Sequence, residues 1–408
     1  MNAELIIIGN ELLNGKISDK NTKEFATFCR DQGIDLQRVT IIQDNEESFN
    51  SIMSQAIKRS DIIVTSGGLG PTKDDLTKKM LASFFNKKIQ FSNEALKIVD
   101  LQYSSKDRIF DKETSDYQNI PTDFEALLNP TGYAPALFYS FDKNKLILAT
   151  PGVPSEFKSI INISLKAKLP VLNSKNNQVI VKTRFIPEAK IFNDLCPGLW
   201  EKLEKYGQVS SLPNPLGVDI GVILNDSTNR KIVTDIICES SIKENIWHVG
   251  SESLEELVVK EAKGKKVTFG FAESCTGGLC ASRITDISGC SEVFWGSVVS
   301  YANEVKERII DVNAHTLKEH GAVSLETAKE MAIGAKASMN CDVIVSTTGI
   351  AGPGGGSTDK PVGTVAIGFT SKEETGSKIF NFNGNREDLK FRFSQAALFK
   401  LLDLIRAY

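Results

Sequence analysis

One stretch predicts a strand, a tight turn and a helix in succession: Phe271-Ala272-Glu273-Ser274-Cys275-Thr276-Gly277-Gly278. It ends an alternating apolar run from Lys266 to Phe271, and helical periodicity begins near Thr276. Ser274 would then lie at a helix N-terminus, where free N–H groups favour negative charge. A serine hydroxyl there can attack a carbonyl carbon while these N–H groups stabilise the oxyanion. Alternatively Ser274 or Thr276 caps the helix, and the stretch alone favours the cap.

A lysine follows the next predicted strand, Phe294 to Tyr301, after a short turn. If that strand ends at Tyr301, the side chains of Tyr301 and Lys306 can point into one cleft. A partly desolvated lysine loses basicity and can accept a proton from a serine, directly or through Tyr301. The alternative is a buried aromatic ring beside a solvated lysine, and the spacing leaves both open.

The rest of this C-terminal region alternates helices with strands. The pattern predicts a helix over 324–339, a buried strand over 343–345, a strand over 362–369 and a terminal helix over 387–407. A loop of small residues, Ser346 to Gly356, follows the buried strand, and its free amides suit a phosphate or a carboxylate. Arg386, near the start of the terminal helix, can pair with a phosphate.

The N-terminal region also alternates strands and helices. Strands are predicted over 5–8, 36–42 and 61–65, with helices over 21–32 and 46–58 between them. Such units form a parallel sheet with helices on both faces. Ligands of these sheets bind outside the carboxyl ends of the strands.

A glycine-rich loop, Thr65 to Asp75, follows the third of these strands. Its glycines let the backbone approach a phosphate closely. Nearby carboxylates favour a divalent metal, because hard cations prefer oxygen ligands. A plain Gly-Pro turn with acidic residues facing the helix dipole is the alternative. The candidate N-terminal residues are Gly67, Gly68, Gly70 and Thr72 for substrate and Glu11, Asp44, Asp74 and Asp75 for metal.

The middle of the chain reads as a small α+β module. Strands are predicted over 178–186 and 217–224, with helices over 188–206 and 231–241. The module ends near Ser253, which with Glu256 forms a predicted capping box. Because it has no cluster of ionisable groups, we interpret it as a connector or an interaction domain.

Composition indicates a globular protein of two or three domains. The chain has 408 residues, of which 41% are hydrophobic and 24% charged. A net charge of −3 argues against nucleic acid as a partner and favours a small substrate held by local positive groups. Seven cysteines without a Cys-x-x-Cys pair indicate reduced thiols. No apolar run reaches the ~20 residues of a membrane span. We therefore expect a cytoplasmic protein.

Four ordered motifs carry a family resemblance. Ala-Glu-Ser-Cys-Thr-Gly-Gly (272–278), Val-Val-Ser-Tyr-Ala-Asn-Glu-Val-Lys (298–306), Gly-Ala-Val-Ser (321–324) and Thr-Gly-Ile-Ala-Gly-Pro-Gly-Gly-Gly (348–356) resemble the nicotinamide mononucleotide deamidase domain of the CinA family. Gly-Asn-Glu-Leu-Leu-Asn-Gly (9–15) and Ser-Gly-Gly-Leu-Gly-Pro-Thr-Lys-Asp-Asp (66–75) resemble that family's molybdopterin-binding-like domain.

The resemblance implies an α/β protein of three parts. Residues 1–170 form a parallel-sheet molybdopterin-binding-like domain, residues 171–252 a KH-like α+β connector and residues 253–408 an α/β deamidase domain. The first domain is expected to be a metal-dependent ADP-ribose pyrophosphatase, whereas the deamidase needs no cofactor. The expected partners are a pyridine nucleotide, ADP-ribose and a second copy of the chain in a homodimer.

The resemblance also implies the roles of individual residues. The nucleophile falls on Ser274, with Tyr301 and Lys306 completing the catalytic set. The expected reaction is hydrolysis of nicotinamide mononucleotide to nicotinate mononucleotide and ammonia. A protein that binds nucleotides or molybdopterin without turnover is the alternative for the N-terminal half. The residues expected to bind the deamidase substrate are Thr276, Gly277, Gly278, Thr348, Gly349, Gly352 and Arg386.

Overall fold

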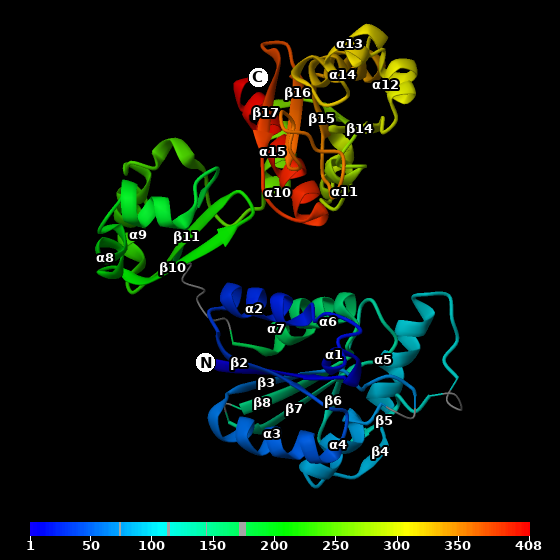
Figure 1. Ribbon diagram of the computed structural model, residues 1–408. Helices are drawn as coiled ribbons and strands as arrows, with labels where there is room; N and C mark the ends of the chain where they lie inside the picture. Colours follow the sequence, from blue (N-terminus) through cyan, green and yellow to red (C-terminus); the bar gives the residue numbers. More distant parts are fainter. Residues whose placement is uncertain (73–74, 112–114, 144, 171–176) are drawn as a thin grey trace. The chain divides into compact units, whose positions relative to one another are not determined.

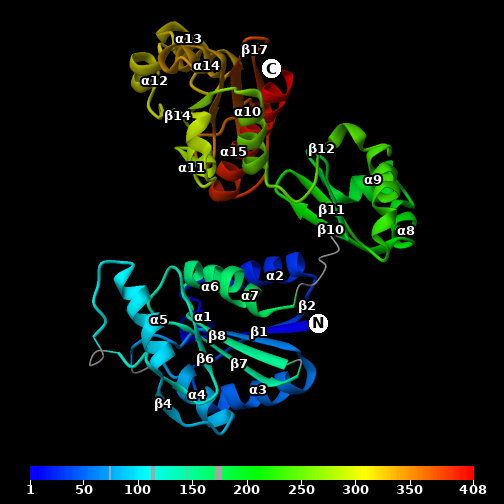
Figure 2. The same cartoon turned by 180° about the vertical axis from the view of Figure 1, so that it is seen from behind.

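The computed structural model describes residues 1–72, 75–111, 115–143, 145–170 and 177–408. The chain divides into two units, Met1–Asn176 and Asn177–Tyr408, shown from opposite sides in Figures 1 and 2. Within the described ranges, no helix combines the length and apolarity needed to cross a bilayer. All seven cysteines are free.

The first unit is built on a mostly parallel six-stranded sheet in the order β2-β1-β3-β8-β7-β6. The predicted parallel arrangement is confirmed for the first four strands, whereas β7 pairs antiparallel with both β8 and β6. The strands are β1 (Asn2–Ile8), β2 (Asp35–Ile42), β3 (Ile62–Ser66), β6 (Glu125–Leu127), β7 (Ala136–Asp142) and β8 (Lys145–Thr150).

Helices cover both faces of this sheet (Figure 1). Phe25 of α2 packs edge-on against Phe157 of α6 on one face, and Phe49 of α3 against Phe84 of α4 on the other. These apolar stripes form two cores, one on each side of the buried strands. The helices are α1 (Asn10–Leu13), α2 (Asn21–Gln32), α3 (Glu46–Arg59), α4 (Thr77–Phe84), α5 (Asn93–Ser104), α6 (Pro154–Ile160), the π-helix η1 (Ile161–Leu165) and α7 (Lys166–Lys168). Strands β4 (Ile89–Phe91) and β5 (Asn119–Pro121) form a separate two-stranded antiparallel sheet.

The second unit begins with an antiparallel sheet in the order β10-β11-β9-β12. The predicted helix over 188–206 is wrong as one element, because Pro197 and the left-handed Gly198 interrupt it. The elements are β9 (Gln178–Thr183), the π-helix η2 (Lys190–Leu195), α8 (Leu199–Glu204), β10 (Gly207–Asn214), β11 (Gly217–Leu224), the 3-10 helix η3 (Ser227–Asn229), α9 (Arg230–Cys238), the 3-10 helix η4 (Lys243–Asn245) and β12 (Ile246–Val249).

A second sheet in this unit has the order β14-β13-β15-β16-β17. Its first three strands are parallel, whereas β16 pairs antiparallel with both β15 and β17. Helices α10, α11 and α15 pack on one face, and α12 and α14 on the other. The elements are α10 (Leu254–Lys265), β13 (Phe269–Glu273), α11 (Leu279–Thr285), the 3-10 helix η5 (Cys290–Glu292), β14 (Phe294–Val299), α12 (Asn303–Ile310), α13 (Ala314–His320), α14 (Leu325–Met339), β15 (Val343–Gly349), β16 (Thr364–Thr370), β17 (Thr375–Asn381) and α15 (Arg386–Ala407).

The predicted capping box is confirmed at the start of α10. The Ser253 hydroxyl accepts a hydrogen bond from the Glu256 amide, and the Glu256 carboxylate accepts one from the Ser253 amide. The strand predicted from Lys266 begins instead at Phe269, because Lys266 takes a left-handed conformation that ends α10. The capped helix α10 therefore connects β12 of the first sheet to β13 of the second along the chain.

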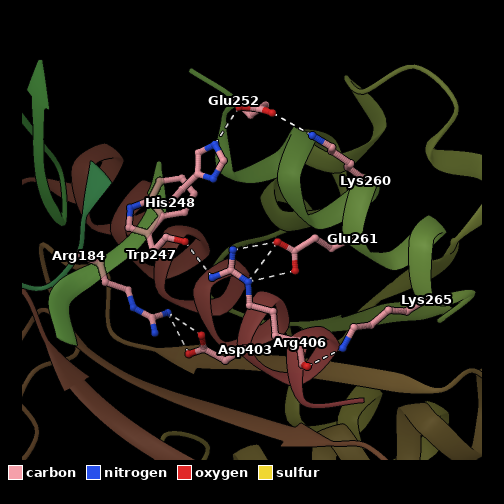
Figure 3. Close-up of polar contacts among 9 residues, drawn as sticks. All are labelled: Arg184, Trp247, His248, Glu252, Lys260, Glu261, Lys265, Asp403 and Arg406. Carbon is pink, nitrogen blue, oxygen red and sulfur yellow. Dashed lines mark hydrogen bonds and ion pairs between the residues drawn. The ribbon is translucent and has the colours of Figure 1, made fainter. Parts of the chain in front are cut away.

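The end of α15 joins the two sheets of the second unit (Figure 3). Asp403 accepts two 2.9 Å hydrogen bonds from Arg184, and Arg406 bridges the Trp247 carbonyl and Glu261. The rings of Trp247 and Phe399 lie edge to face at 5.4 Å. Trp247 and Phe399 belong to one continuous hydrophobic core, so the antiparallel sheet is fixed to the C-terminal domain by apolar packing as well as by charge.

Truncating Phe399 to alanine is expected to lower the free energy of unfolding of the second unit by about 3–5 kcal/mol, because a buried ring at this junction leaves a cavity. All three tryptophans, Trp200, Trp247 and Trp295, lie in this unit, so urea unfolding followed by tryptophan fluorescence reports on it selectively. Ile379→Ala, at a 40% exposed position on β17, is the control and should cost about 1 kcal/mol or less. Equal effects of the two variants would contradict the role given to Phe399.

Candidate functional site

The predicted catalytic residues meet at the carboxyl ends of three adjacent parallel strands. Ser274 follows β13, Tyr301 and Lys306 follow β14, and the small-residue loop follows β15. They surround a cavity of about 260 Å³. The residues that line it include Ser274, Tyr301, Lys306, Thr348, Gly349, Gly352 and Arg386.

Lys306 is fixed against Ser274 in a nearly solvent-free position. Its side chain is 1% exposed and that of Ser274 8%. The Lys306 Nζ lies 3.1 Å from the Ser274 Oγ, 2.8 Å from the Ser300 carbonyl oxygen and 3.0 Å from the Tyr301 carbonyl oxygen. A neutral amine has two N–H bonds and one lone pair. If the two carbonyls accept the N–H bonds, the lone pair faces the Ser274 hydroxyl.

Burial lowers the pKa of Lys306 below its ordinary value of 10.5. The three hydrogen-bond partners of its Nζ are uncharged oxygens, so they compensate an ammonium only in part. The adjacent Cys275 stays a neutral thiol, since burial raises its pKa to about 12. The arrangement therefore favours a serine nucleophile with a lysine base.

Tyr301 and Arg386 lie together beside the cavity. The Tyr301 side chain is 63% exposed, and its hydroxyl accepts a 3.4 Å hydrogen bond from Arg386. Arg386 also donates to the Gly352 carbonyl at 2.6 Å, which connects the start of α15 to the small-residue loop that follows β15. Tyr301 contacts the Lys306 amine through its main-chain carbonyl and not through its hydroxyl. Ser274 contacts the Lys306 amine through its side-chain hydroxyl.

The turn after Ser274 differs from the prediction. Helix α11 begins at Leu279 rather than near Thr276, because Gly277 and Gly278 both have positive φ angles. The Gly277 amide donates to the Ser274 carbonyl, and the Gly278 amide donates to the Glu273 carboxylate. Two of the amides expected to face the substrate are therefore already engaged within the protein.

Two threonines hold the strand ends together. The Thr276 hydroxyl lies 2.7 Å from that of Thr347, and both side chains are buried. Thr348, expected to bind substrate, donates its hydroxyl to the Ala322 carbonyl at 2.6 Å. Thr348 thus fixes the loop over 348–356 against the segment before α14, and its hydroxyl oxygen keeps acceptor capacity.

Sequence reasoning missed Glu273, which is completely buried beside Ser274. Its carboxylate accepts hydrogen bonds from the amides of Gly278, Cys280 and Ala281 and from the Ser297 hydroxyl. The signal that could have found it is an acidic residue at the end of a buried strand, directly before a glycine turn. A carboxylate is buried at such a position only where hydrogen-bond donors surround it.

The three histidines lie away from this cavity. His248 pairs with Glu252 and His315 with Glu319, and His320 lies near Glu319 and Glu326. None of them lines the cavity around Ser274. In the part of the chain that the structure describes, the serine–lysine pair thus stands without a histidine.

A second cavity, of about 610 Å³, lies at the strand ends of the first unit. The glycine loop contributes to its lining, and Thr72 lines an adjoining cavity of about 210 Å³. Gly67 has a φ of +116°, and a Cβ there would lie 2.2 Å from the Ile8 carbonyl oxygen. The predicted residues that line the larger cavity are Glu11, Asp44, Gly67, Gly68, Gly70 and Asp75, whereas Asp74 lies outside the described residues.

Among the predicted metal ligands, Asp75 is engaged in hydrogen bonds within the glycine-rich loop. The Asp75 carboxylate accepts hydrogen bonds from the Thr72 amide at 2.9 Å and the Thr72 hydroxyl at 2.5 Å. Within the ranges that the structure describes, no three acidic, cysteine or histidine side chains are grouped as metal ligands. Asp75 stabilises the glycine loop in this arrangement.

Comparisons with known proteins match two separate parts of the chain to described families. The family model described as "CinA C-terminal domain" matches residues 251–405, and one described as "Probable molybdopterin binding domain" matches residues 4–172. A protein of Thermoanaerobacter pseudethanolicus described as competence-damage inducible is 38% identical, covering 100% of this chain and 98% of its own length. A CinA-like protein of Chlorobium limicola is 34% identical, covering 98% and 96% respectively.

Among solved structures, the competence/damage inducible protein CihA from Agrobacterium tumefaciens is 34% identical. It covers 39% of this chain and 99% of its own, with a TM-score of 0.36. The family assignment rests on the relatives that match over the whole length. The chain therefore belongs to the CinA family.

Proposed function

We propose that the C-terminal domain hydrolyses the carboxamide of nicotinamide mononucleotide to nicotinate mononucleotide and ammonia. The observation that carries this proposal is the 3.1 Å contact between the buried Lys306 Nζ and the Ser274 Oγ inside a cavity. A serine and a neutral lysine suffice for amide hydrolysis through an acyl-enzyme. The choice of substrate comes from the family resemblance and from the arginine beside the cavity.

The first half-reaction forms an ester on Ser274. Lys306 takes the hydroxyl proton as the Ser274 Oγ attacks the carboxamide carbon, giving a tetrahedral oxyanion and a lysine ammonium. When the intermediate collapses, the C–N bond breaks and the Lys306 proton passes to the leaving nitrogen, which departs as ammonia. Lys306 is then neutral again and can take a proton from the water that hydrolyses the ester.

The oxyanion needs donors that are not already engaged. The amides of Gly277 and Gly278 donate to Ser274 and Glu273. In the described turns and loops, the amides of Cys275 and Thr276 do not donate to a main-chain carbonyl. We assign the oxyanion to these two amides, which directly follow the nucleophile.

Arg386 is expected to hold the 5′-phosphate. Replacing it by glutamine should raise KM for nicotinamide mononucleotide by about 10- to 100-fold with kcat within a few fold, because a charged hydrogen bond of about 1.5–3 kcal/mol is lost equally in the ground and transition states. Steady-state kinetics measure both constants. Arg392→Gln, on the same helix, is the control and should leave KM unchanged; a fall in kcat alone for the Arg386 variant would contradict phosphate binding.

Ammonia release tests the deamidase proposal directly. The purified protein is incubated with nicotinamide mononucleotide, and ammonia and nicotinate mononucleotide are quantified together. Equal molar amounts of both products are expected. Binding of the nucleotide without either product would favour the alternative of a nucleotide-binding protein without turnover.

We also propose that the first unit hydrolyses ADP-ribose to AMP and ribose 5-phosphate. The observation that favours it is the large cavity at the ends of the parallel strands, lined by the glycine loop. AMP formation from ADP-ribose, measured with and without added Mg²⁺ or Mn²⁺, tests both the activity and the need for a metal. Nucleotide or molybdopterin binding without AMP formation would favour a binding role instead.

A further inference from the structure

A buried negative charge lies directly beside the proposed nucleophile. Glu273 is 0% exposed and ends β13, one residue before Ser274. Its Oε2 accepts from the Gly278 and Cys280 amides, each at 3.0 Å, and its Oε1 from the Ala281 amide at 3.0 Å and the Ser297 hydroxyl at 2.9 Å. These four hydrogen bonds compensate the carboxylate for the loss of hydration on burial.

These contacts fix the turn that carries Ser274 at both of its ends. The carboxylate binds the first amides of α11, while the backbone of Glu273 belongs to β13. The four intervening residues, Ser274 to Gly277, are thus enclosed in a loop closed by hydrogen bonds to a single side chain. Two of those residues have the amides that we assign to the oxyanion.

The same residue is connected to the proposed base. The Glu273 carbonyl accepts a 2.8 Å hydrogen bond from the Ser300 amide, and the Ser300 carbonyl accepts from the Lys306 Nζ. The Ser297 hydroxyl, on β14 just before Ser300, donates to the Glu273 carboxylate. The nucleophile after β13 and the base after β14 are therefore both connected to Glu273 by hydrogen bonds.

We propose that the Glu273 carboxylate is a positioning residue, which holds the Ser274 hydroxyl in line with Lys306 and keeps the amides of Cys275 and Thr276 directed at the oxyanion. This inference rests on the proposed serine–lysine function of the site. A purely structural residue would change only stability when replaced. A positioning residue changes the alignment of the nucleophile, the base and the oxyanion donors, and therefore kcat.

Glu273→Gln is the central test. Glutamine has a similar shape, but its NH₂ group would face amide donors, so the turn loses part of its support. We expect kcat for ammonia release to fall about 100-fold, as for a displacement of reacting groups by about 1 Å. KM should stay within about threefold, because the contacts of Arg386 and the loop over 348–356 are unchanged. Glu273→Asp, which keeps the charge but is one methylene shorter, should give an intermediate kcat.

A matched control separates positioning from general stability. Glu255 also holds α11, since it accepts a 2.7 Å hydrogen bond from Arg283, but it does not line the cavity around Ser274. Glu255→Gln should lower Tm and leave kcat within about threefold. Kinetics are run well below the lowest Tm. An unchanged kcat for Glu273→Gln, or an equal loss for Glu255→Gln, would overturn the inference.

A substrate-independent measurement separates this inference from the proposed function. The rate at which a fluorophosphonate labels Ser274, followed by intact-protein mass spectrometry, depends on the nucleophile, its base and the oxyanion donors but not on the nucleotide substrate. We expect labelling of Glu273→Gln to slow by at least about tenfold. If the unaltered protein released no ammonia but this slowing were found, the substrate assignment would fail and the positioning role would stand; equal labelling rates would overturn the positioning role.

Discussion

Replacing Ser274 by alanine is expected to lower ammonia release from nicotinamide mononucleotide by about 10⁴-fold or more, since loss of the nucleophile in a serine hydrolase costs up to about 10⁶ in kcat. The Ser274 hydroxyl has one side-chain partner among the described residues, the Lys306 amine. Removing it should therefore change Tm by only a few degrees. Coupled detection of ammonia measures the rate, and circular dichroism checks the fold.

Ser300→Ala provides the matched serine control. Ser300 is completely buried and holds Lys306 through its main-chain carbonyl, while its hydroxyl has no hydrogen-bond partner in the described structure. Deleting that hydroxyl leaves the carbonyl in place, so turnover should stay within about threefold. Near-normal turnover in Ser274→Ala, or a comparable loss in both variants, would refute Ser274 as the nucleophile.

The sequence predicted the parallel framework well because apolar runs and caps are local signals. The runs at 5–8 and 61–65 became β1 and β3, and the helix predicted over 21–32 is α2 with Gly33 as its left-handed C-cap. Strand β17 was missed, because an edge strand without a buried residue needs no continuous apolar run. The broken helix around Pro197 was missed because periodicity alone bridged the break.

The membership of the candidate site was predictable, but its internal hydrogen bonds were not. Strand ends in a parallel sheet converge, so Ser274, Lys306 and the loop over 348–356 were expected near one another. Which donor meets which acceptor depends on φ angles such as those of Gly277 and Gly278, which set where α11 begins. The assignment of the Gly278 amide to Glu273 instead of the substrate therefore needed coordinates.

Replacing Lys306 by methionine is expected to lower kcat/KM for ammonia release by about 10²–10⁴-fold, the usual contribution of a general base. Methionine keeps most of the aliphatic stem but cannot accept the Ser274 proton. Lys306→Arg should be equally impaired, because a guanidinium stays protonated and has no acceptor. Lys329→Met, at an exposed position on α14, is the control and should retain full activity. An active Lys306→Arg enzyme would contradict proton transfer to Lys306.

The pH dependence gives an independent test of the same lysine. Its neutral form is the base, and burial lowers its pKa from 10.5, so kcat/KM should rise with pH to a plateau reached below pH 10.5. Between the folded-state and unfolded-state pKa values the unfolded chain binds more protons, so the stability of the folded protein should also rise with pH across this window. Lys306→Met removes the titrating group, and its stability should be flatter over that range. If the residual activity of Lys306→Met still rises with pH in the same range, the titrating group is not Lys306. If both the rise in activity and the rise in stability disappear in this variant, the buried amine of Lys306 accounts for both.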